Sequence, residues 1–167
     1  MDLNVQKLLR YWFAASALAL IIGGDAMAQK QFHTTGNVGR WNLFRDGNYC
    51  WMTSEFVPGG RHRKMLLMVD SEGEVIIHLN PKRSMRSSKW EGISLSAGSL
   101  TFAFVDEHGW GVNPQKDQSG IRRALFSSRR ADFDAVLIHK SKRVSMKGYF
   151  NTGKGAEAYK KMVETCG

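Results

Sequence analysis

The feature that most constrains this chain is a series of short segments, rich in β-branched and aromatic residues, separated by clusters of Gly, Asp, Asn and Ser. They cover residues 41–45, 49–55, 64–69, 74–80, 99–105, 120–126, 133–139 and 143–150. Segments of this length and composition predict β-strands. The short polar stretches 46–48 and 70–73 between them predict antiparallel hairpins.

Apolar and polar residues alternate within some of these segments, as a half-buried sheet requires. Residues 100, 102 and 104 (Leu, Phe, Phe) share one strand face, and residues 133, 135 and 137 (Phe, Ala, Leu) share another. We expect both sets to be core positions. The predicted fold is mostly β, an antiparallel β-sandwich of about eight strands with one C-terminal α-helix.

The C-terminal segment has a helical period instead. Its apolar residues recur on one face, with charged residues on the other. The apolar set is Ala156, Tyr159, Met162, Val163 and Cys166. The charged set is Lys154, Glu157, Lys160, Lys161 and Glu164. We expect the apolar stripe to pack on the sheet.

The N-terminus reads as a cleavable signal peptide that covers residues 1–28. Lys7 and Arg10 precede an uncharged apolar run at 11–22, and the small-x-small sequence Ala26-Met27-Ala28 follows. The run is too short for a bilayer, which takes about 20 apolar residues to cross. An uncleaved anchor is the alternative. The sequence predicts Sec export to the periplasm or beyond the cell.

The remaining residues, 29–167, contain no repeat and no linker, which predicts a single domain able to support its own core. Both cysteines, Cys50 and Cys166, lie in this part. Because export places them in an oxidising compartment, we expect them to form a disulfide between an early strand and the last helix. A metal site or a catalytic thiol is the alternative, but the sequence lacks a CxxC or Cys/His cluster.

Several of these features together resemble the invasion-associated locus B family of Gram-negative bacteria. The resemblance rests on the exported leader, the Trp-led strand at 41–44, the cysteine-bearing strand at 49–50, and the stretch 145–150 ahead of a helix that ends in Cys166. It covers about residues 38–167. It implies a small β-sandwich in the envelope or medium, a non-enzymatic role associated in some pathogens with host-cell invasion, and no catalytic residues. The single cysteine pair and residues 81–89 depart from the family pattern.

Charge is the feature most suggestive of function. The net charge is +9, and the leader holds two charges of each sign, so the domain is strongly basic. The basic clusters fall in predicted loops or at strand ends, which predicts a basic rim. Besides the site named next, they include Arg122, Arg123, Arg129, Arg130, Lys140, Lys142 and Arg143.

The predicted site is a surface that binds anions, and it centres on residues 81–90, where four cations and a tryptophan occur together. Its members are Arg61, Arg63, Lys64, Lys82, Arg83, Arg86, Lys89 and Trp90. Clustered cations attract lipid head groups, lipopolysaccharide phosphates or acidic polymers, and the indole suits an interface. Peripheral membrane contact fits this chemistry, and nucleic acid is the weaker choice. Alternatively these loops only keep the protein soluble.

The sequence gives little indication of catalysis. Its five histidines are scattered, so no metal and no cofactor are predicted. The nearest catalytic cluster is Asp106-Glu107-His108, which a polar hairpin tip explains equally well. We therefore predict a non-enzymatic protein, with a hydrolase as a remote alternative.

The tryptophans suggest one more alternative, a dedicated protein-binding module such as an inhibitor or assembly factor. We assign Trp41 and Trp51 to the core. Trp90 and Trp110 are the indoles that we expect at a contact surface for a glycan or an unidentified protein.

Overall fold

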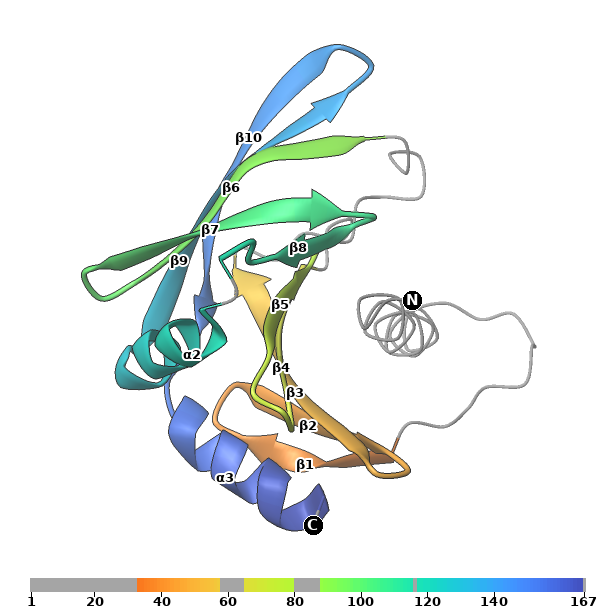
Figure 1. The fold of residues 1–167 in the computed structure, drawn as a ribbon, viewed down its shortest axis with the longest axis vertical. Helices are drawn as coiled ribbons and strands as arrows, with labels where there is room; N and C mark the ends of the chain where they lie inside the picture. The colour runs from red at the N-terminus through yellow and green to blue at the C-terminus, as the bar shows by residue number, and fades with distance from the viewer. Residues whose placement is uncertain (1–32, 58–64, 80–87, 116, 167) are drawn as a thin grey trace, which may run out of the picture. The chain divides into compact units, whose positions relative to one another are not determined.

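The computed structural model describes residues 33–57, 65–79, 88–115 and 117–166, which apart from His33 belong to one unit, Thr34–Gly167 (Figure 1). In these ranges the chain forms ten strands and two helices. The strands are β1 (His33–Val38), β2 (Trp41–Asp46), β3 (Tyr49–Val57), β4 (Leu66–Asp70), β5 (Val75–His78), β6 (Lys89–Ala97), β7 (Leu100–Glu107), β8 (Trp110–Val112), β9 (Arg130–His139) and β10 (Lys142–Asn151). The helices are α2 (Gln118–Ser127) and α3 (Gly155–Cys166).

The sheet closes on itself, so the predicted β-sandwich is wrong. Eight strands form an antiparallel barrel in the order β3-β10-β9-β6-β7-β8-β5-β4, and β4 returns to pair with β3. β2 and β1 extend the sheet outside this ring.

Closure depends on a short pairing between strands far apart in sequence. β10 meets β3 through two residue pairs, Tyr149 with Val57 and Phe150 with Phe56. Strands in a sandwich and in a barrel both alternate between a buried and an exposed face, so their sequence patterns are alike. The alternation therefore predicted the strands without revealing that the sheet closes.

Three strands, β1, β6 and β8, were missed by the sequence analysis, and β6 shows why. Gly92 has a φ of 58°, and the register with β9 shifts between Glu91 and Ser94. This bulge adds one residue, so the inward side chains Trp90 and Ile93 stand three positions apart rather than two. The period-two pattern is broken where the strand begins.

The segment 120–126, predicted as a strand, lies in helix α2. Ile121, Ala124 and Leu125 are its buried residues, at the i, i+3, i+4 spacing of a helix. Asp117 caps its N-terminus, since its carboxylate accepts a hydrogen bond from the Gly120 amide at 3.0 Å. The sequence analysis assigned these apolar residues the two-residue period of a strand, whereas their spacing is that of a helix.

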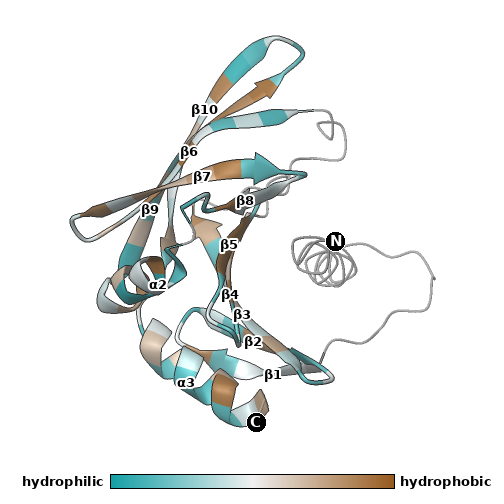
Figure 2. Cartoon of the chain, in the orientation of Figure 1, coloured by the Kyte–Doolittle hydropathy of each residue, from teal (hydrophilic) through white to brown (hydrophobic). Residues whose placement is uncertain are grey.

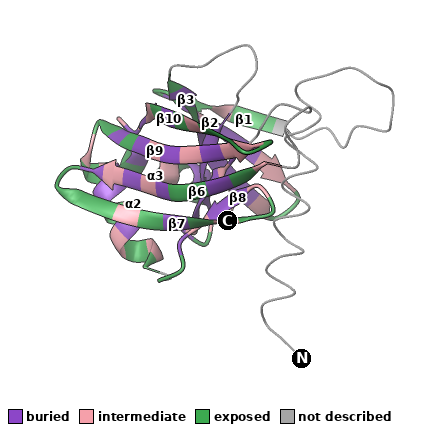
Figure 3. Ribbon diagram, turned by 90° about the horizontal axis from the view of Figure 1, so that it is seen from above, coloured by how far each residue is buried: buried purple, intermediate pink, exposed green. Residues whose placement is uncertain are grey.

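The barrel interior is apolar, and β9 alternates between buried and more exposed residues, whereas β4 is buried along its whole length (Figure 3). Phe133, Ala135 and Leu137 are buried as predicted. Leu100 is not a core residue, since it is 53% exposed at the start of β7, whereas Phe104 on the same face is buried. α2 joins the interior cluster through Ile121 and Leu125.

The strand connections divide into two rims. One rim, here called the helical rim, contains the β4–β5 and β6–β7 turns and both helices, which contact each other (Figure 1). The opposite rim contains the β7–β8 and β9–β10 turns. The β9–β10 hairpin extends beyond its neighbours at this second rim (Figure 1).

Helix α3 packs against β2 and β3 and is tied to the sheet by a disulfide between Cys50 and Cys166, which confirms the predicted pairing. Their Cα atoms are 6.1 Å apart. The buried residues of α3 are Gly155, Ala158 and Met162. Of the predicted stripe, Met162 is buried and Tyr159 and Cys166 pack partly buried against the core, whereas Val163 is 41% exposed. Ala156 is exposed as well. Neither α2 nor α3, the helices that the structure describes, is long and apolar enough to span a membrane.

Candidate functional site

Four cations come together at the tip of the β9–β10 hairpin and the adjacent start of β6, and one of them, Lys89, is far in sequence from the other three. They are Lys89, Lys140, Lys142 and Arg143, and all four side chains are exposed. We name this group the basic rim. Figure 2 shows hydrophilic colouring at the outer end of β10, next to the apolar end of β9.

Strand register places these cations together. Lys89 lies opposite Ile138, and Ile138 lies opposite Arg143, so Lys89 and Arg143 belong to one row across β6, β9 and β10. Neighbouring strands are about 4.8 Å apart, which separates the backbones of Lys89 and Arg143 by roughly 10 Å. Lys142 pairs with His139 at the end of the hairpin.

A two-residue turn forms the tip. Lys140 and Ser141 have φ values of 47° and 63°, as expected for the turn type that best matches the twist of a hairpin. Next to it, Ser88 and His139 share a hydrogen bond of 2.9 Å between Oγ and Nδ1, which joins the start of β6 to the hairpin. Paired strands therefore hold the residues of the basic rim in place.

Acidic side chains compensate this charge only in part. Glu91 forms an exposed ion pair with Arg143 at 3.1 Å, an interaction worth about 0–1 kcal/mol. Glu107 is exposed at the same rim. The Asp106 carboxylate accepts backbone hydrogen bonds from Gly109 at 2.8 Å and Trp90 at 3.2 Å, which ties it to the fold.

Most of the predicted site lies outside the residues that the structure describes. This holds for Arg61, Arg63, Lys64, Lys82, Arg83 and Arg86. Lys89 is exposed as expected. Trp90 is not at the surface: it is 6% exposed, packs edge-on against Phe133 and belongs to the interior cluster.

The other predicted basic clusters are divided from the basic rim. Arg122, Arg123, Arg129 and Arg130 lie on or next to α2, at the helical rim. Arg122 donates a hydrogen bond to the Gly73 carbonyl at 2.8 Å, and Arg130 forms an ion pair with Asp132. The sequence could not separate the two groups because it does not show which strand ends share a rim.

Asp106, Glu107 and His108, the nearest arrangement to a catalytic cluster in the sequence, form the end of β7 and the start of the β7–β8 turn. His108 has a φ of 56° and precedes Gly109, and both oxygens of the Asp106 carboxylate are engaged by backbone amides. The polar hairpin tip accounts for these three residues. Among the described residues, no group of three or more His, Cys, Asp or Glu side chains is arranged to hold a metal ion.

One histidine has a strongly shifted pKa. Burial lowers the pKa of His78 to about 4, because the charged imidazolium loses its hydration. Its ring lies 4.6 Å from that of Trp110, which is 8% exposed. Trp110 is therefore buried beside an imidazole rather than presented as a contact surface. Trp41 is in the interior cluster as predicted, and Trp51 is buried against Phe44.

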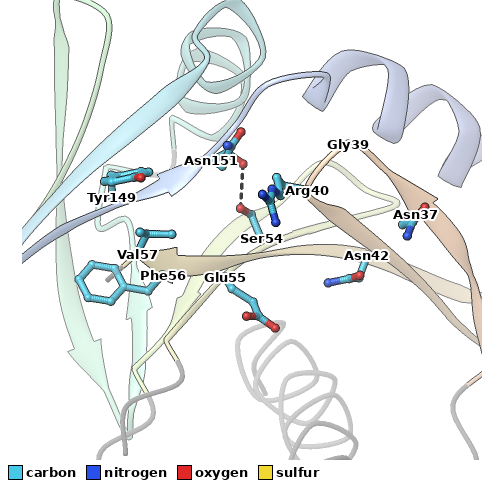
Figure 4. A pocket seen from close by; sticks show the side chains of 10 residues that line it. All are labelled: Asn37, Gly39, Arg40, Asn42, Ser54, Glu55, Phe56, Val57, Tyr149 and Asn151. Atoms are coloured by element: carbon cyan, nitrogen blue, oxygen red, sulfur yellow. Dashed lines mark hydrogen bonds between the residues drawn. The ribbon is translucent and has the colours of Figure 1, made fainter. Parts of the chain in front are cut away.

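A separate polar notch lies where β2 and β10 diverge along one edge of β3 (Figure 4). β2 pairs with β3 as far as Thr53, and β10 pairs with it from Phe56. Within the described pairings, Ser54 and Glu55 have no strand beside them on this edge. The Ser54 hydroxyl donates to the Asn151 carbonyl at 2.8 Å across the gap.

The notch is a cavity of about 540 Å³. We define the polar notch by the side chains that give it its chemistry: Asn37, Arg40, Asn42, Glu55, Tyr149 and Asn151. They come from β1, the β1–β2 turn, β2, β3 and β10. The sequence analysis found none of them as site residues, because only the β3–β10 pairing brings them together.

No protein-family model matches the chain, and neither a curated protein nor a solved structure matches it. The resemblance to the invasion-associated locus B family therefore stays a prediction.

Proposed function

We propose that this protein is an exported, non-enzymatic binding protein that attaches to an anionic surface through the basic rim. The carrying observation is that Lys89, Lys140, Lys142 and Arg143, from two separate basic clusters of the sequence, meet at one end of the barrel. In this proposal residues 1–28 direct Sec export, and the protein acts in the periplasm or outside the cell.

Four more strand ends lie at the same end of the barrel as the basic rim. β3 ends at Val57 and β4 begins at Leu66 at the end of the barrel opposite the helical rim. β5 ends and β6 begins at this same end, where the basic rim also lies. The other predicted site residues, Arg61, Arg63, Lys64, Lys82, Arg83 and Arg86, lie between these strands in the sequence and outside the described residues.

The four cations of the basic rim raise the affinity of the protein for an anionic surface. Each Lys or Arg near an anionic bilayer contributes about 1 kcal/mol, so the four cations contribute roughly 3 to 4 kcal/mol once the Arg143 pair with Glu91 is allowed for. This corresponds to about a hundred- to thousandfold in affinity. Salt shortens the range of the attraction, so binding should weaken steeply as salt rises.

The test is binding to anionic and neutral vesicles at low and high salt, with protein recovered from the periplasm of an expression host. One variant replaces Lys89, Lys140, Lys142 and Arg143 by Ser. The matched control replaces four exposed cations at the helical rim, Arg123, Arg129, Lys160 and Lys161, and so removes the same charge. We expect salt-sensitive binding to anionic vesicles that is lost only in the first variant. Equal losses in both variants would mean that net charge, not the basic rim, drives binding.

One observation favours a second candidate, a protein-binding module. β1 is the last strand of the extension β2-β1 and has a neighbour on one side only among the described strands. A free strand edge accepts a partner strand through backbone hydrogen bonds. This function predicts one stoichiometric partner whose binding changes little with salt.

A further inference from the structure

We infer that the polar notch is a second binding site, independent of the basic rim, and that it takes a neutral saccharide of one or two sugar units. The cavity of about 540 Å³ lies within the range of small-ligand sites, about 300–1,000 Å³. Its opening is set by how β2 and β10 separate along β3, so the paired strands fix its shape (Figure 4).

The side chains of the polar notch match hydroxyl groups. Asn37, Asn42 and Asn151 each carry an amide that donates and accepts hydrogen bonds, as sugar hydroxyls also do. Asn37 and Asn42 make no side-chain hydrogen bond with any described residue, so both amides are available. The Asn151 Oδ1 accepts from the Gly153 amide at 3.2 Å, which holds that side chain in place.

The positive and negative charges of the polar notch balance, so its ligand should differ in charge from the anionic ligand of the basic rim. Arg40 and Glu55 supply one charge of each sign, and neither forms an ion pair with a described residue. Glu55 would repel a phosphate or carboxylate, and Arg40 would repel a cation. A neutral ligand with many hydroxyls meets no such penalty, and both planar groups can make paired hydrogen bonds to neighbouring hydroxyls.

Apolar surface completes the cavity. Tyr149 and Val57 supply the exposed apolar surface on the side formed by β10 and the end of β3, while the Phe56 ring is buried against Phe133 and Phe150 (Figure 4). The Arg130 guanidinium lies 4.6 Å from the Tyr149 ring centroid and helps to hold this ring. Such an aromatic side chain offers a flat surface to the C–H groups of a sugar, while its hydroxyl remains a hydrogen-bonding group.

The experiment is an NMR titration of the isotope-labelled protein with two neutral disaccharides, di-N-acetylchitobiose and maltose. Diglycine serves as a smaller, zwitterionic probe that carries one charge of each sign. We expect at least one disaccharide to bind with a Kd of about 1 mM, a common value for a small polar ligand, and to shift the backbone signals of β2, β3 and β10 near the notch.

Two variants and one control locate the site. Asn42→Ala should weaken disaccharide binding about tenfold or more, whereas Asn48→Ala, an exposed amide in the β2–β3 turn, should leave it unchanged. Glu55→Gln keeps the shape and should weaken binding by about two- to tenfold, since a neutral hydrogen bond replaces a charged one. If Asn42→Ala does not fold, the exposed Glu55→Gln change carries the test.

The inference fails if neither disaccharide shifts the notch signals, if both notch variants bind as well as the control, or if diglycine binds and the sugars do not. The basic-rim variant should bind disaccharide normally. Because vesicle binding is measured separately, failure at either site leaves the other result interpretable.

Discussion

The two rims of the barrel differ in what their residues do. At the helical rim, α2 and α3 bury Leu125, Ala158 and Met162, and the disulfide joins α3 to β3. At the basic rim, a two-residue turn presents exposed cations, and the ion pair between Arg143 and Glu91 beside it is exposed and weak. Side chains at the first rim hold the fold, and the four cations at the second are exposed, so stability and the proposed binding should be separable by mutation.

Arginine illustrates the difference. At the helical rim, Arg122 donates to the Gly73 carbonyl and lies over the Tyr159 ring at 5.3 Å, so it connects α2, the β4–β5 turn and α3. At the basic rim, Arg143 forms an ion pair with an exposed partner, Glu91, at 3.1 Å. Cations that look equivalent in the sequence therefore serve structure in one place and surface charge in the other.

The largest effect on stability should come from the helix that covers the interior. Leu125→Ala removes a fully buried side chain, and we expect a loss of about 2–5 kcal/mol in the free energy of unfolding. Chemical denaturation measures it, with Leu100→Ala at the 53% exposed position as the control. Similar small losses in both variants would show that α2 does not seal the barrel.

The disulfide should come next. Replacing Cys50 and Cys166 together by Ser should lower the free energy of unfolding by about 2–4 kcal/mol, because the bridge closes a loop of most of the domain. Mass spectrometry with thiol alkylation should find no free thiol in the exported protein. Full alkylation without reductant would contradict the bridge.

Lowering the pH should reduce the free energy of unfolding through protonation of His78. Its pKa is about 4 in the folded protein and 6.5 in the unfolded chain, so the unfolded state binds the proton first. Its contribution to stability is complete above pH 6.5 and should fall by at most about 3 kcal/mol as the pH drops to about 4. Burial raises the pKa of Asp70, which acts in the opposite direction.

The measurement is the difference in unfolding free energy between the native protein and His78→Gln across this pH range. The variant should lack this part of the acid sensitivity. Parallel curves for the two proteins would rule out His78 as its source.

The smallest effect on stability should come from the basic rim itself. Replacing Lys89, Lys140, Lys142 and Arg143 by Ser should change the free energy of unfolding by less than about 0.5 kcal/mol per site, as is usual for exposed positions. Thermal and chemical denaturation of the variant used for vesicle binding give this number. A large loss of stability would mean that this rim also holds the fold.

The sequence predicted what depends on local pattern. The hairpin turns at 46–48 and 70–73, the buried set on β9, the last helix and the cysteine pair could all be inferred from nearby residues and the predicted compartment. The barrel could not be inferred from the sequence, because its closure depends on the pairing of β3 with β10, which are far apart in the chain.

Local irregularity explains other misses. The bulge at Gly92 hid β6 and left Trp90 in a supposed surface loop, and α2 was taken for a strand because its apolar residues are few. The polar notch gathers side chains from elements at both ends of the chain, so no local motif could indicate it.

The most direct test of the central proposal is which rim touches an anionic surface. An environment-sensitive fluorophore can be attached to Ser141→Cys at the β9–β10 tip or to Ser99→Cys in the β6–β7 turn of the helical rim. With anionic vesicles, we expect the label at position 141 to shift its emission and to be quenched by nitroxide lipids, while the label at 99 stays as in water. Quenching at position 99 alone, or at neither position while the protein is bound, would contradict attachment through the basic rim.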